Sequence, residues 1–318
     1  MRKSPVYVSN LEVSRLLRTS DSIRLARDAY IKLARHQALS PERFVLTVPR
    51  KTSFFIMPAH IIGQKTVTVK IARLNPANAP RGLPSVMASL YVYDSTTGVE
   101  LARVEGEELT AIRTAAGSAV ATDLLAPGSC DTLGIIGTGK QARAQVPALL
   151  KVRKFSEILV YSRRKAHRDK FAEQIQKTHQ VRVRPAASPE EVAGSSQVLV
   201  LATNSETPLF DGNLVNRGTH VNAIGSALPT TREVDDNLVA RSFIVVDSIP
   251  QAISTYGDIM IPLKQRKINL EDLNELGQLL TRPIPLPGGE MISLFKSGGL
   301  AVLDAVFADY IVRCLRQQ

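Results

Sequence analysis

The sequence predicts an α/β protein with two parts, one built on a parallel sheet and one of mixed α+β type. Three observations lead to this prediction. Short apolar runs follow one another after residue 128, with helical patterns between several of them. A glycine-rich turn separates the first of these runs from a helix, whereas the runs before residue 100 have an antiparallel pattern. We therefore expect residues 119–296 to form the parallel-sheet domain, and residues 1–118 with 297–318 to form the other.

The first third of the chain reads as an antiparallel α+β unit. Residues 21–38 have apolar side chains at helical spacing among charged ones, which predicts an amphipathic helix. Four strand-like runs follow, at residues 44–48, 53–57, 66–72 and 89–94. The polar residues 94–98, which end in a glycine, predict a hairpin turn.

The rest of the chain alternates between helix and strand. An alanine-rich helix is predicted over residues 106–125, and an amphipathic helix over residues 298–315 that returns to pack on the first part. Between them lie six apolar runs, at residues 132–137, 157–161, 181–185, 197–203, 220–225 and 243–247. Helical patterns between such runs are typical of βαβ units with a parallel sheet.

The composition is that of an ordinary globular protein. Of 318 residues, 44% are hydrophobic and 22% are charged, a balance that allows a sizeable core. No run of about 18 apolar residues predicts a membrane-spanning helix, and the basic first residues lack the apolar core of a secretion signal. Cys130 and Cys314 are too few for a disulfide framework. We expect a cytoplasmic protein with no membrane partner.

The net charge of +11 favours anionic ligands, although it does not indicate a nucleic-acid partner. Lys and Arg are spread along the chain, with one dense cluster at residues 163–170, and no basic stretch is interleaved with aromatic residues. The five histidines lack the spacing of metal ligands, so no metal site is expected. A basic surface serving an anionic substrate and cofactor is the better interpretation.

The glycine-rich turn directly follows the apolar run that begins at residue 132. Its residues are the predicted cofactor-binding residues Gly137, Thr138, Gly139, Lys140, Gln141 and Ala142. This is the G-x-G-x-x-G/A pattern between a strand and a helix, which predicts a dinucleotide-binding Rossmann-type domain. Gly137 allows the tight turn, Gly139 lets the backbone approach a pyrophosphate, and Ala142 allows close packing of helix and strand. The first N–H groups of the helix then face the phosphates.

The end of the second strand of this domain bears on the choice of cofactor. Sites that prefer NAD place an acidic residue there for the ribose hydroxyl, whereas arginine accommodates a 2′-phosphate. This chain has Ser162, Arg163 and Arg164 at that point. We expect NADP(H) as the cofactor, with NAD(H) as the alternative.

Several segments together resemble the ornithine cyclodeaminase/μ-crystallin family. They are residues 55–59, 69–70, 82–85, 108–116, 137–145, 221–225 and 294–297. The resemblance covers nearly the whole chain in order. It implies a homodimer, in which the first third and the C-terminal helix form the substrate-binding and dimerisation domain. Members of the family include cyclodeaminases, an alanine dehydrogenase, and reductases of ketimines and pyrroline-2-carboxylate.

The resemblance also implies the substrate site. Arg43, Lys70 and Arg113 match the positions that bind the substrate carboxylate, with Met57 and Ser85 as further substrate contacts. Arginine supplies a bidentate fork and lysine a point charge, which suits an α-imino or α-amino acid. Lys70 is also the candidate proton donor. Arg113 carries a charge within an otherwise small and apolar segment, which is expensive unless the charge is paired or faces a site.

Three further cofactor contacts are expected, Thr203, Ser226 and Lys296, and the same resemblance places Ser226 and Lys296 near the nicotinamide. Two departures from the family pattern bear on the reaction. Ala227 stands where the cyclodeaminase and alanine dehydrogenase branches have a catalytic aspartate, and Phe55 stands where the ornithine-specific enzymes have a glutamate. Removing ammonia from an amino acid needs a base, whereas reducing a protonated imine needs a hydride and an orienting clamp.

We therefore expect an NAD(P)H-dependent reductase of small cyclic imino acids that forms proline or pipecolate. The substrate would be Δ1-pyrroline-2-carboxylate, Δ1-piperideine-2-carboxylate or a related ketimine. Two alternatives stay open. One is an ornithine cyclodeaminase or an amino-acid dehydrogenase of the alanine dehydrogenase type, and the other is a non-catalytic NADPH or small-molecule binder of the μ-crystallin type.

Overall fold

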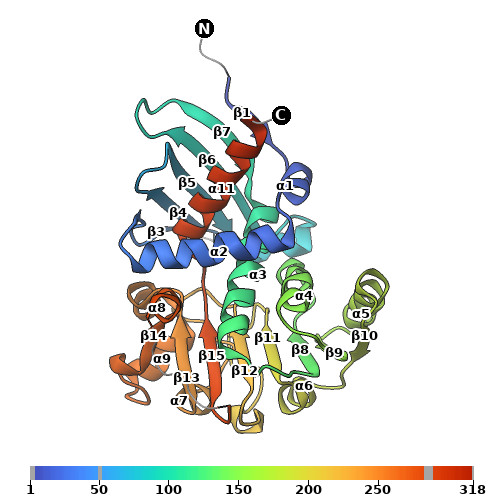
Figure 1. The fold of residues 1–318 in the computed structure, drawn as a ribbon. Coiled ribbons are helices and arrows are strands. Elements are labelled where there is room, and N and C mark those ends of the chain that lie inside the picture. Colours follow the sequence, from blue (N-terminus) through green and yellow to red (C-terminus); the bar gives the residue numbers. More distant parts are fainter. Residues whose placement is uncertain (1–3, 49–51, 283–288, 317–318) are drawn as a thin grey trace. The chain divides into compact units, whose positions relative to one another are not determined.

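The computed structural model describes residues 4–48, 52–282 and 289–316. The chain divides into two compact units, residues 1–113 with 299–318 and residues 114–298 (Figure 1). The expected boundaries fell at 118/119 and 296/297, and the functions expected of the two parts stay predictions. Residues 1–3, 49–51 and 317–318 of the first expected part, and residues 283–288 of the second, lie outside the described residues. The α/β fold class is confirmed.

The first unit is a sheet with three helices. In the sheet order β1-β7-β6-β5-β4-β2, every neighbouring pair is antiparallel except β1 and β7, and β3 also pairs with β4. The strands are β1 (Val6–Val8), β2 (Ala38–Leu39), β3 (Phe44–Val48), β4 (Thr52–Ile61), β5 (Thr66–Leu74), β6 (Val86–Asp94) and β7 (Glu100–Glu105). The helices are α1 (Asn10–Leu16), α2 (Thr19–Ala34) and α11 (Ala301–Arg316), with a 3-10 turn η1 (Pro76–Arg81).

Several of the expected elements in this unit begin or end at other residues than predicted, and two of them differ by four residues. The helix expected over residues 21–38 stops at Ala34, because His36 has a left-handed backbone with φ of 55° and strand β2 then begins. Strand β4 continues through Pro58 to Ile61, well beyond the expected residues 53–57. The hairpin turn at residues 94–98 is confirmed, since the Gly98 N–H donates to the Asp94 carbonyl.

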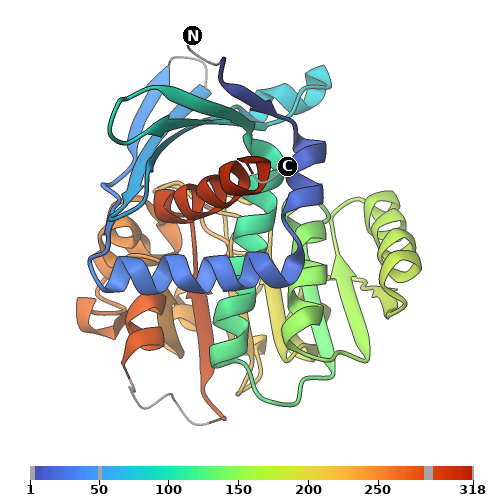
Figure 2. The same cartoon turned by 45° about the horizontal axis from the view of Figure 1, so that its top comes forward.

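Helix α11 covers one face of the first unit's sheet, where it contacts β4, β5, β6 and β7 (Figure 2). Buried and half-buried residues alternate along β4, as expected of a strand with one face toward the core. The helix itself is not amphipathic in the expected sense, because Ala301 to Ala308 are all buried and α2 also packs on it. Because the first two turns of α11 are buried all round, a charged residue there must be paired.

The second unit is an eight-stranded parallel sheet in the order β10-β9-β8-β11-β12-β15-β13-β14. Its strands are β8 (Thr132–Ile136), β9 (Glu157–Tyr161), β10 (Arg182–Pro185), β11 (Val198–Leu201), β12 (His220–Ala223), β13 (Ser242–Val246), β14 (Leu273–Glu275) and β15 (Ile292–Lys296). The six expected strands are present with small differences at their ends. Sequence analysis missed β14 and also β15, which lies between β12 and β13.

Helices flank this sheet, and the two faces have separate cores. They are α3 (Gly106–Leu125), shared with the first unit, α4 (Lys140–Val152), α5 (Lys165–His179), α6 (Pro189–Ser195), α7 (Asp236–Ala240), α8 (Ile249–Thr255), α9 (Gly257–Lys264) and α10 (Leu276–Thr281). Along β11, Val198 and Val200 belong to one hydrophobic cluster, whereas Leu199 and Leu201 belong to the other. The strand is therefore covered on both sides, as in doubly wound α/β folds. Among the described residues, no helix is both long and apolar enough to span a bilayer.

Candidate active site

A cluster of three charged side chains lies buried in the first unit. The Lys70 ammonium donates to Asp304 Oδ1 at 2.8 Å and to Thr110 Oγ1 at 2.7 Å. The Arg113 guanidinium donates from Nε to the same Asp304 oxygen at 3.3 Å. Lys70 is 1%, Arg113 5% and Asp304 0% exposed. Charges buried to this degree need partners. Lys70 and Arg113, two of the predicted substrate-binding residues, share Asp304 as their partner.

Three elements of the first unit hold this cluster. Lys70 lies on the buried face of β5, paired in register with Met57 on β4 and Leu90 on β6. Arg113 lies three residues after Thr110 on α3, so the two share one side of the helix. Asp304 lies in the first turn of α11. Met57 and Lys70, two of the predicted substrate contacts, are thus directly opposite each other on neighbouring strands.

Burial changes the acidity of Lys70. Loss of solvent, aided by the positive charges of Arg113 and Arg43, lowers its pKa from 10.5 to about 8. The Asp304 carboxylate acts in the opposite direction. A lysine with a pKa of about 8 exchanges protons readily near neutral pH, which suits a proton donor. Lys70 is therefore the residue in this cluster best suited to acid–base chemistry.

Two more of the predicted substrate contacts belong to the first unit. Arg43 lies over the Phe55 ring, 5.7 Å from its centroid. Phe55 is 8% exposed and presents an aromatic face, so it offers no charge to pair with a second ammonium group. Ser85 lies half-buried just before β6, and its carbonyl accepts from the Asn75 N–H. The binding roles of Arg43 and Ser85 stay predictions.

Sequence analysis did not identify Asp304. The signal was present, because Asp304 stands among Ala301, Val302, Leu303 and Ala305 in a strongly apolar segment. The reasoning that singled out Arg113, a charge in an apolar helix, applies equally to Asp304. The residue was passed over because the C-terminal helix was expected to have a polar face.

The glycine turn of the second unit has the geometry that a dinucleotide needs. Gly137 has φ of +114°, and a Cβ there would lie 2.3 Å from the Ala202 carbonyl oxygen. Gly139 precedes α4, and a Cβ there would meet no atom within 4 Å. Ala142 is fully buried in the first turn of α4. The backbone is therefore open at Gly139, where a pyrophosphate would approach the N-terminus of α4.

The predicted ribose-side residues lie after β9. Arg163 and Arg164 are exposed, and Arg164 is the residue before the first turn of α5. The Ser162 hydroxyl donates to the Arg164 carbonyl at 3.4 Å, while Arg168 donates to the Ser162 carbonyl and lies over the Tyr161 ring. The two exposed guanidinium groups are accessible to an anionic ligand.

The three further expected cofactor contacts, Thr203, Ser226 and Lys296, lie at or just after the carboxyl ends of β11, β12 and β15. All three are held in a buried polar network with Glu233 and Asp258. The Thr203 hydroxyl donates to Glu233 Oε1 at 2.7 Å, and the Lys296 ammonium contacts Asp258 Oδ2 at 2.8 Å and the Ser226 carbonyl at 2.5 Å. These are adjacent parallel strands, and ligands of such sheets bind outside their carboxyl ends. Contact with a cofactor stays a prediction for all three.

Glu233 and Asp258 are further residues that sequence analysis did not assign. Glu233 accepts from the N–H groups of Thr203, Gly225 and Ser226, so one carboxylate joins the ends of β11 and β12. Burial raises the pKa of Glu233, an effect that Lys296 opposes. Asp258 accepts from the N–H of Glu233 at 2.6 Å. Together they fix the loop that follows β12.

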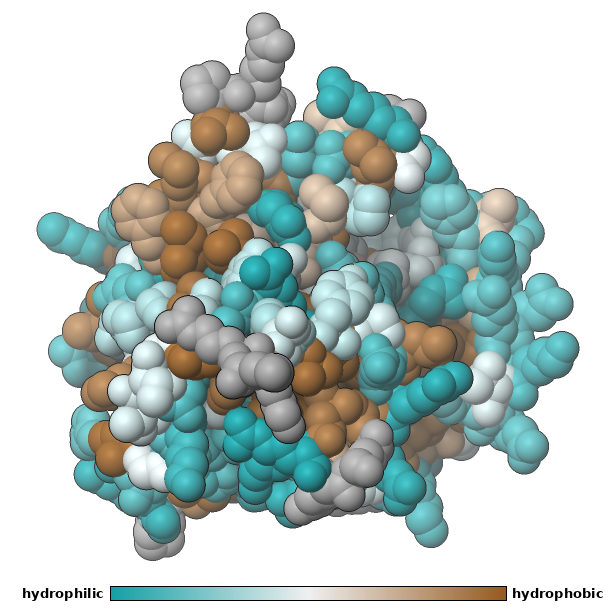
Figure 3. Space-filling view, turned by 90° about the horizontal axis from the view of Figure 1, so that it is seen from above, coloured by the Kyte–Doolittle hydropathy of each residue, from teal (hydrophilic) through white to brown (hydrophobic). Residues whose placement is uncertain are grey.

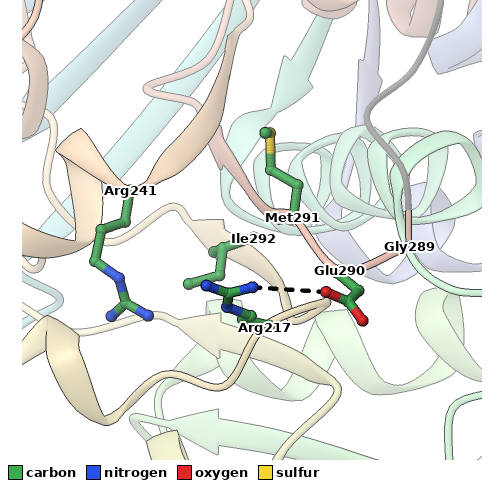
Figure 4. A pocket seen from close by; sticks show the side chains of 6 residues that line it. All are labelled: Arg217, Arg241, Gly289, Glu290, Met291 and Ile292. Carbon is green, nitrogen blue, oxygen red and sulfur yellow. Dashed lines mark ion pairs between the residues drawn. The ribbon is translucent and has the colours of Figure 1, made fainter.

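A cavity of about 550 Å³ lies where the strands of this sheet begin, at the end opposite to their carboxyl ends (Figure 4). Its lining includes Arg217 before β12, Arg241 before β13 and Ile292 at the start of β15. Arg217 lies 3.6 Å from Glu290, and Arg241 donates to the Gly212 carbonyl. These are the amino ends of the strands, so the cavity does not belong to the predicted cofactor site. Within the described part of the chain, no group of three or more His, Cys, Asp or Glu side chains is arranged to hold a metal ion.

Comparison with known proteins identifies the family. The model of the ornithine cyclodeaminase/mu-crystallin family matches residues 4–317. The chain belongs to this family. Among its relatives, the Δ(1)-pyrroline-2-carboxylate reductase of Bacillus cereus is 32% identical over 317 residues, which cover 98% of this chain and 97% of the relative.

Two solved structures of family type are also similar. One is the Thermococcus litoralis Δ(1)-pyrroline-2-carboxylate reductase in complex with NADH and L-proline, with a TM-score of 0.95, 33% identity and 98% coverage of both chains. The other is an archaeal alanine dehydrogenase dimer with bound NAD, with a TM-score of 0.92 and 28% identity, covering 98% of this chain and 97% of that one.

Within the ornithine cyclodeaminase/mu-crystallin family, two positions of this chain remain informative. Ala227 follows the network residue Ser226 and is half-buried, so the chain has a methyl group where the resemblance predicts an aspartate in the deaminating branches. Phe55 is buried under Arg43, where the ornithine-specific branch is expected to have a glutamate. Neither side chain can accept or release a proton, so neither can replace the base that deamination needs.

Proposed function

We propose that this protein is an NAD(P)H-dependent reductase of small cyclic imino acids such as Δ1-pyrroline-2-carboxylate. The observation that carries the proposal is the buried cluster of Lys70 and Arg113, two cations that share one carboxylate. The names of the Bacillus and Thermococcus relatives, and the L-proline bound by the latter, support the same substrate class. In the balanced reaction, the imino acid, NAD(P)H and a proton yield the cyclic amino acid and NAD(P)⁺.

The glycine turn fits a dinucleotide. Its open backbone at Gly139 and the first turn of α4 would hold the pyrophosphate, and Gly137 has the backbone that the tight turn requires. When bound, the reduced nicotinamide supplies the hydride for the imine carbon. Thr203, Ser226 and Lys296 would line the nicotinamide end of the site.

The protein's own groups bind, orient and protonate the substrate. Arg113 would hold the α-carboxylate through its guanidinium fork, and Lys70 would add a point charge. The three ionised side chains of the cluster carry two positive charges and one negative, and a substrate carboxylate supplies a second negative charge. The Lys70 ammonium, with its pKa of about 8, would donate a hydrogen bond or proton during the reaction. Met57 and Leu90, its neighbours in the sheet, keep that surface apolar.

The side chains at positions 227 and 55 favour reduction over the two alternative activities. Ala227 provides no carboxylate to deprotonate an amine, which disfavours a cyclodeaminase or an amino-acid dehydrogenase. Phe55 provides no partner for the terminal ammonium of ornithine. A purely non-catalytic binder has no need for a buried lysine whose pKa lies near neutrality.

For the coenzyme, we propose a preference for NADPH, with NADH as an alternative. The supporting feature is the pair of exposed guanidinium groups, Arg163 and Arg164, after β9. The related structures contain NADH or NAD, which fits use of either form. An Arg163→Asp variant should shift the ratio of kcat/KM values toward NADH, and an unchanged ratio would contradict the phosphate contact.

We also propose a homodimer formed through the first unit. Strand β3 is exposed along its length, and Phe44 and Leu46 are 61% and 49% exposed. Figure 3 shows apolar side chains gathered among polar ones on one face of the molecule. Exposed apolar surface of this kind marks interaction sites. The alanine dehydrogenase relative is a dimer in its solved structure. A cytoplasmic location is consistent with the two free cysteines, Cys130 and Cys314.

The direct test is to follow NADPH and NADH oxidation with five- and six-membered cyclic imino acids. A separate assay measures whether ornithine is converted to proline and ammonia. We expect turnover of at least one imino acid and formation of no proline from ornithine. Conversion of ornithine to proline and ammonia, without oxidation of reduced coenzyme by any imino acid, would overturn the proposal.

A further inference from the structure

Asp304 is the centre of the charged cluster, although nothing in the sequence pattern assigned it a role. One of its oxygens, Oδ1, accepts from both the Lys70 ammonium and the Arg113 guanidinium. The other oxygen, Oδ2, is buried and has no hydrogen-bond partner among the described residues. A carboxylate with no exposure that uses one oxygen for two cations fixes the positions of both.

The location of Asp304 supports an ionised side chain. It lies in the first turn of α11, where the positive end of the helix dipole favours a negative charge. Its ion pair with Lys70 has a length of 2.8 Å, and both partners are almost completely buried. Because the protein interior has a lower effective dielectric constant than water, the two charges interact more strongly there than they would in solution.

We propose that Asp304 is a positioning residue for the reductase reaction, which holds Lys70 and Arg113 in one cluster and keeps Lys70 protonated when substrate binds. The inference rests on the proposed function, because it assigns the two cations to the substrate. Asp304 acts through them and is not itself required to touch the substrate.

The charges that face Lys70 are few. Asp304 on α11 opposes the loss of its proton, whereas Arg113 on α3 and Arg43 before β3 promote it. Its cross-strand neighbours, Met57 on β4 and Leu90 on β6, carry no charge. Of these three charged groups only Asp304 is acidic, and without it both arginines would drive Lys70 toward the neutral form.

The test is the isosteric variant Asp304→Asn. Removing the negative charge should move the pKa of Lys70 down by about one to three pH units. We expect kcat/KM at about pH 7.5 to fall at least tenfold relative to the wild type, and the loss to shrink at about pH 6, where Lys70 regains its proton. The titration of the substrate imine affects both proteins equally, so the variant-to-wild-type ratio is the quantity to plot against pH.

Asp309 provides a matched control on the same helix. It is also buried, and it accepts from Thr66 Oγ1 at 2.8 Å and pairs with Arg313 rather than with Lys70. Asp309→Asn should lower stability without any pH dependence in its activity ratio. A ratio for Asp304→Asn that is equally flat with pH would reduce Asp304 to a structural role and overturn the inference.

A second readout separates this inference from the proposed function. In protein labelled with ¹³Cε-lysine, NMR reports the pKa of Lys70 without any turnover, and a Lys70→Arg variant assigns the signal. A lower pKa in Asp304→Asn supports the inference even if no imino acid is reduced, a result that would reject only the proposed function. Should Asp304→Asn fail to fold, Arg113→Met is measured instead. Its Lys70 pKa should rise, because a cation is removed and Asp304 is left to Lys70, and an unchanged value would contradict the shared carboxylate.

Discussion

The Lys70 ammonium is buried at a cost that only its partners offset. Water stabilises an ammonium group strongly, and its removal is the main reason that the pKa of Lys70 falls to about 8. Asp304 and Thr110 replace part of that stabilisation with hydrogen bonds. A lysine at such a position is expected to act in binding or catalysis rather than in stability.

Replacing Lys70 by Met should separate its role in catalysis from its effect on stability. We expect kcat/KM to fall by about 10²- to 10⁴-fold, the usual contribution of a general acid. The effect on stability should depend on pH. Because the folded protein lowers the pKa of Lys70 from 10.5 to about 8, the folded state binds fewer protons between these values, and the stability of the wild type rises with pH through this window.

Chemical denaturation of both proteins measures this effect. The difference in unfolding free energy between wild type and Lys70→Met should be constant below about pH 8 and should move in favour of the wild type above it. A difference that does not change with pH would show that Lys70 has an ordinary pKa in the folded protein.

The charged residues differ in how far sequence alone reveals them. Lys70 and Arg113 could be identified because their matched segments and apolar surroundings singled them out. Asp304 has equally apolar neighbours in the sequence, but a helical pattern alone does not show that both sides of its helix are covered. Only the packing of α2 and of the sheet on α11 makes the burial of Asp304 evident.

The turn between β8 and α4 depends on two glycines for different reasons. At Gly137, the left-handed φ and the nearby Ala202 carbonyl exclude a side chain from the fold itself. At Gly139, the backbone has an ordinary φ of −76° and open space around it, so only a ligand would exclude a side chain.

These two positions predict opposite behaviour on substitution by alanine. Gly137→Ala should lower the melting temperature and abolish cofactor binding, since the backbone must shift to accommodate the methyl group. Gly139→Ala should leave the melting temperature unchanged and weaken NADH binding at least tenfold, because the methyl group occupies the space of the pyrophosphate. Thermal melts with fluorescence titration of NADH check both. Tight NADH binding by Gly139→Ala would place the pyrophosphate elsewhere.

Strand prediction succeeded where apolar runs alternate with helices and failed for β15. Residues 292–296 form a short buried run directly after a stretch rich in proline and glycine, and the sequence analysis assigned no strand there. The strand pairs with β12 and β13, which precede it by many residues. Such an insertion into the sheet depends on contacts that are distant in sequence, and no local periodicity reveals it.

Several large apolar side chains of the described residues are exposed to solvent, and we propose that those on β3 are covered in a dimer. Phe44 on β3 is among the most exposed of them, at 61%. A Phe44→Glu variant should convert a dimer into a monomer, because it places a charge in the proposed interface. Leu270 in the second unit is 48% exposed and provides the control, since Leu270→Glu should remain dimeric. Light scattering after size-exclusion chromatography measures both masses, and a dimer that survives Phe44→Glu would move the interface away from β3.

At the scale of the whole molecule, we propose that the buried cations Lys70 and Arg113 recognise the α-carboxylate of a cyclic imine. The most direct measurement compares the reduction of Δ1-pyrroline-2-carboxylate with that of Δ1-pyrroline, which has the same C=N bond but no carboxylate. We predict that kcat/KM is at least about 10²-fold higher for the carboxylate, consistent with a charge-assisted, bidentate contact that also orients the imine. We further predict that Arg113→Lys removes much of this preference. Equal rates with the two imines would contradict the account.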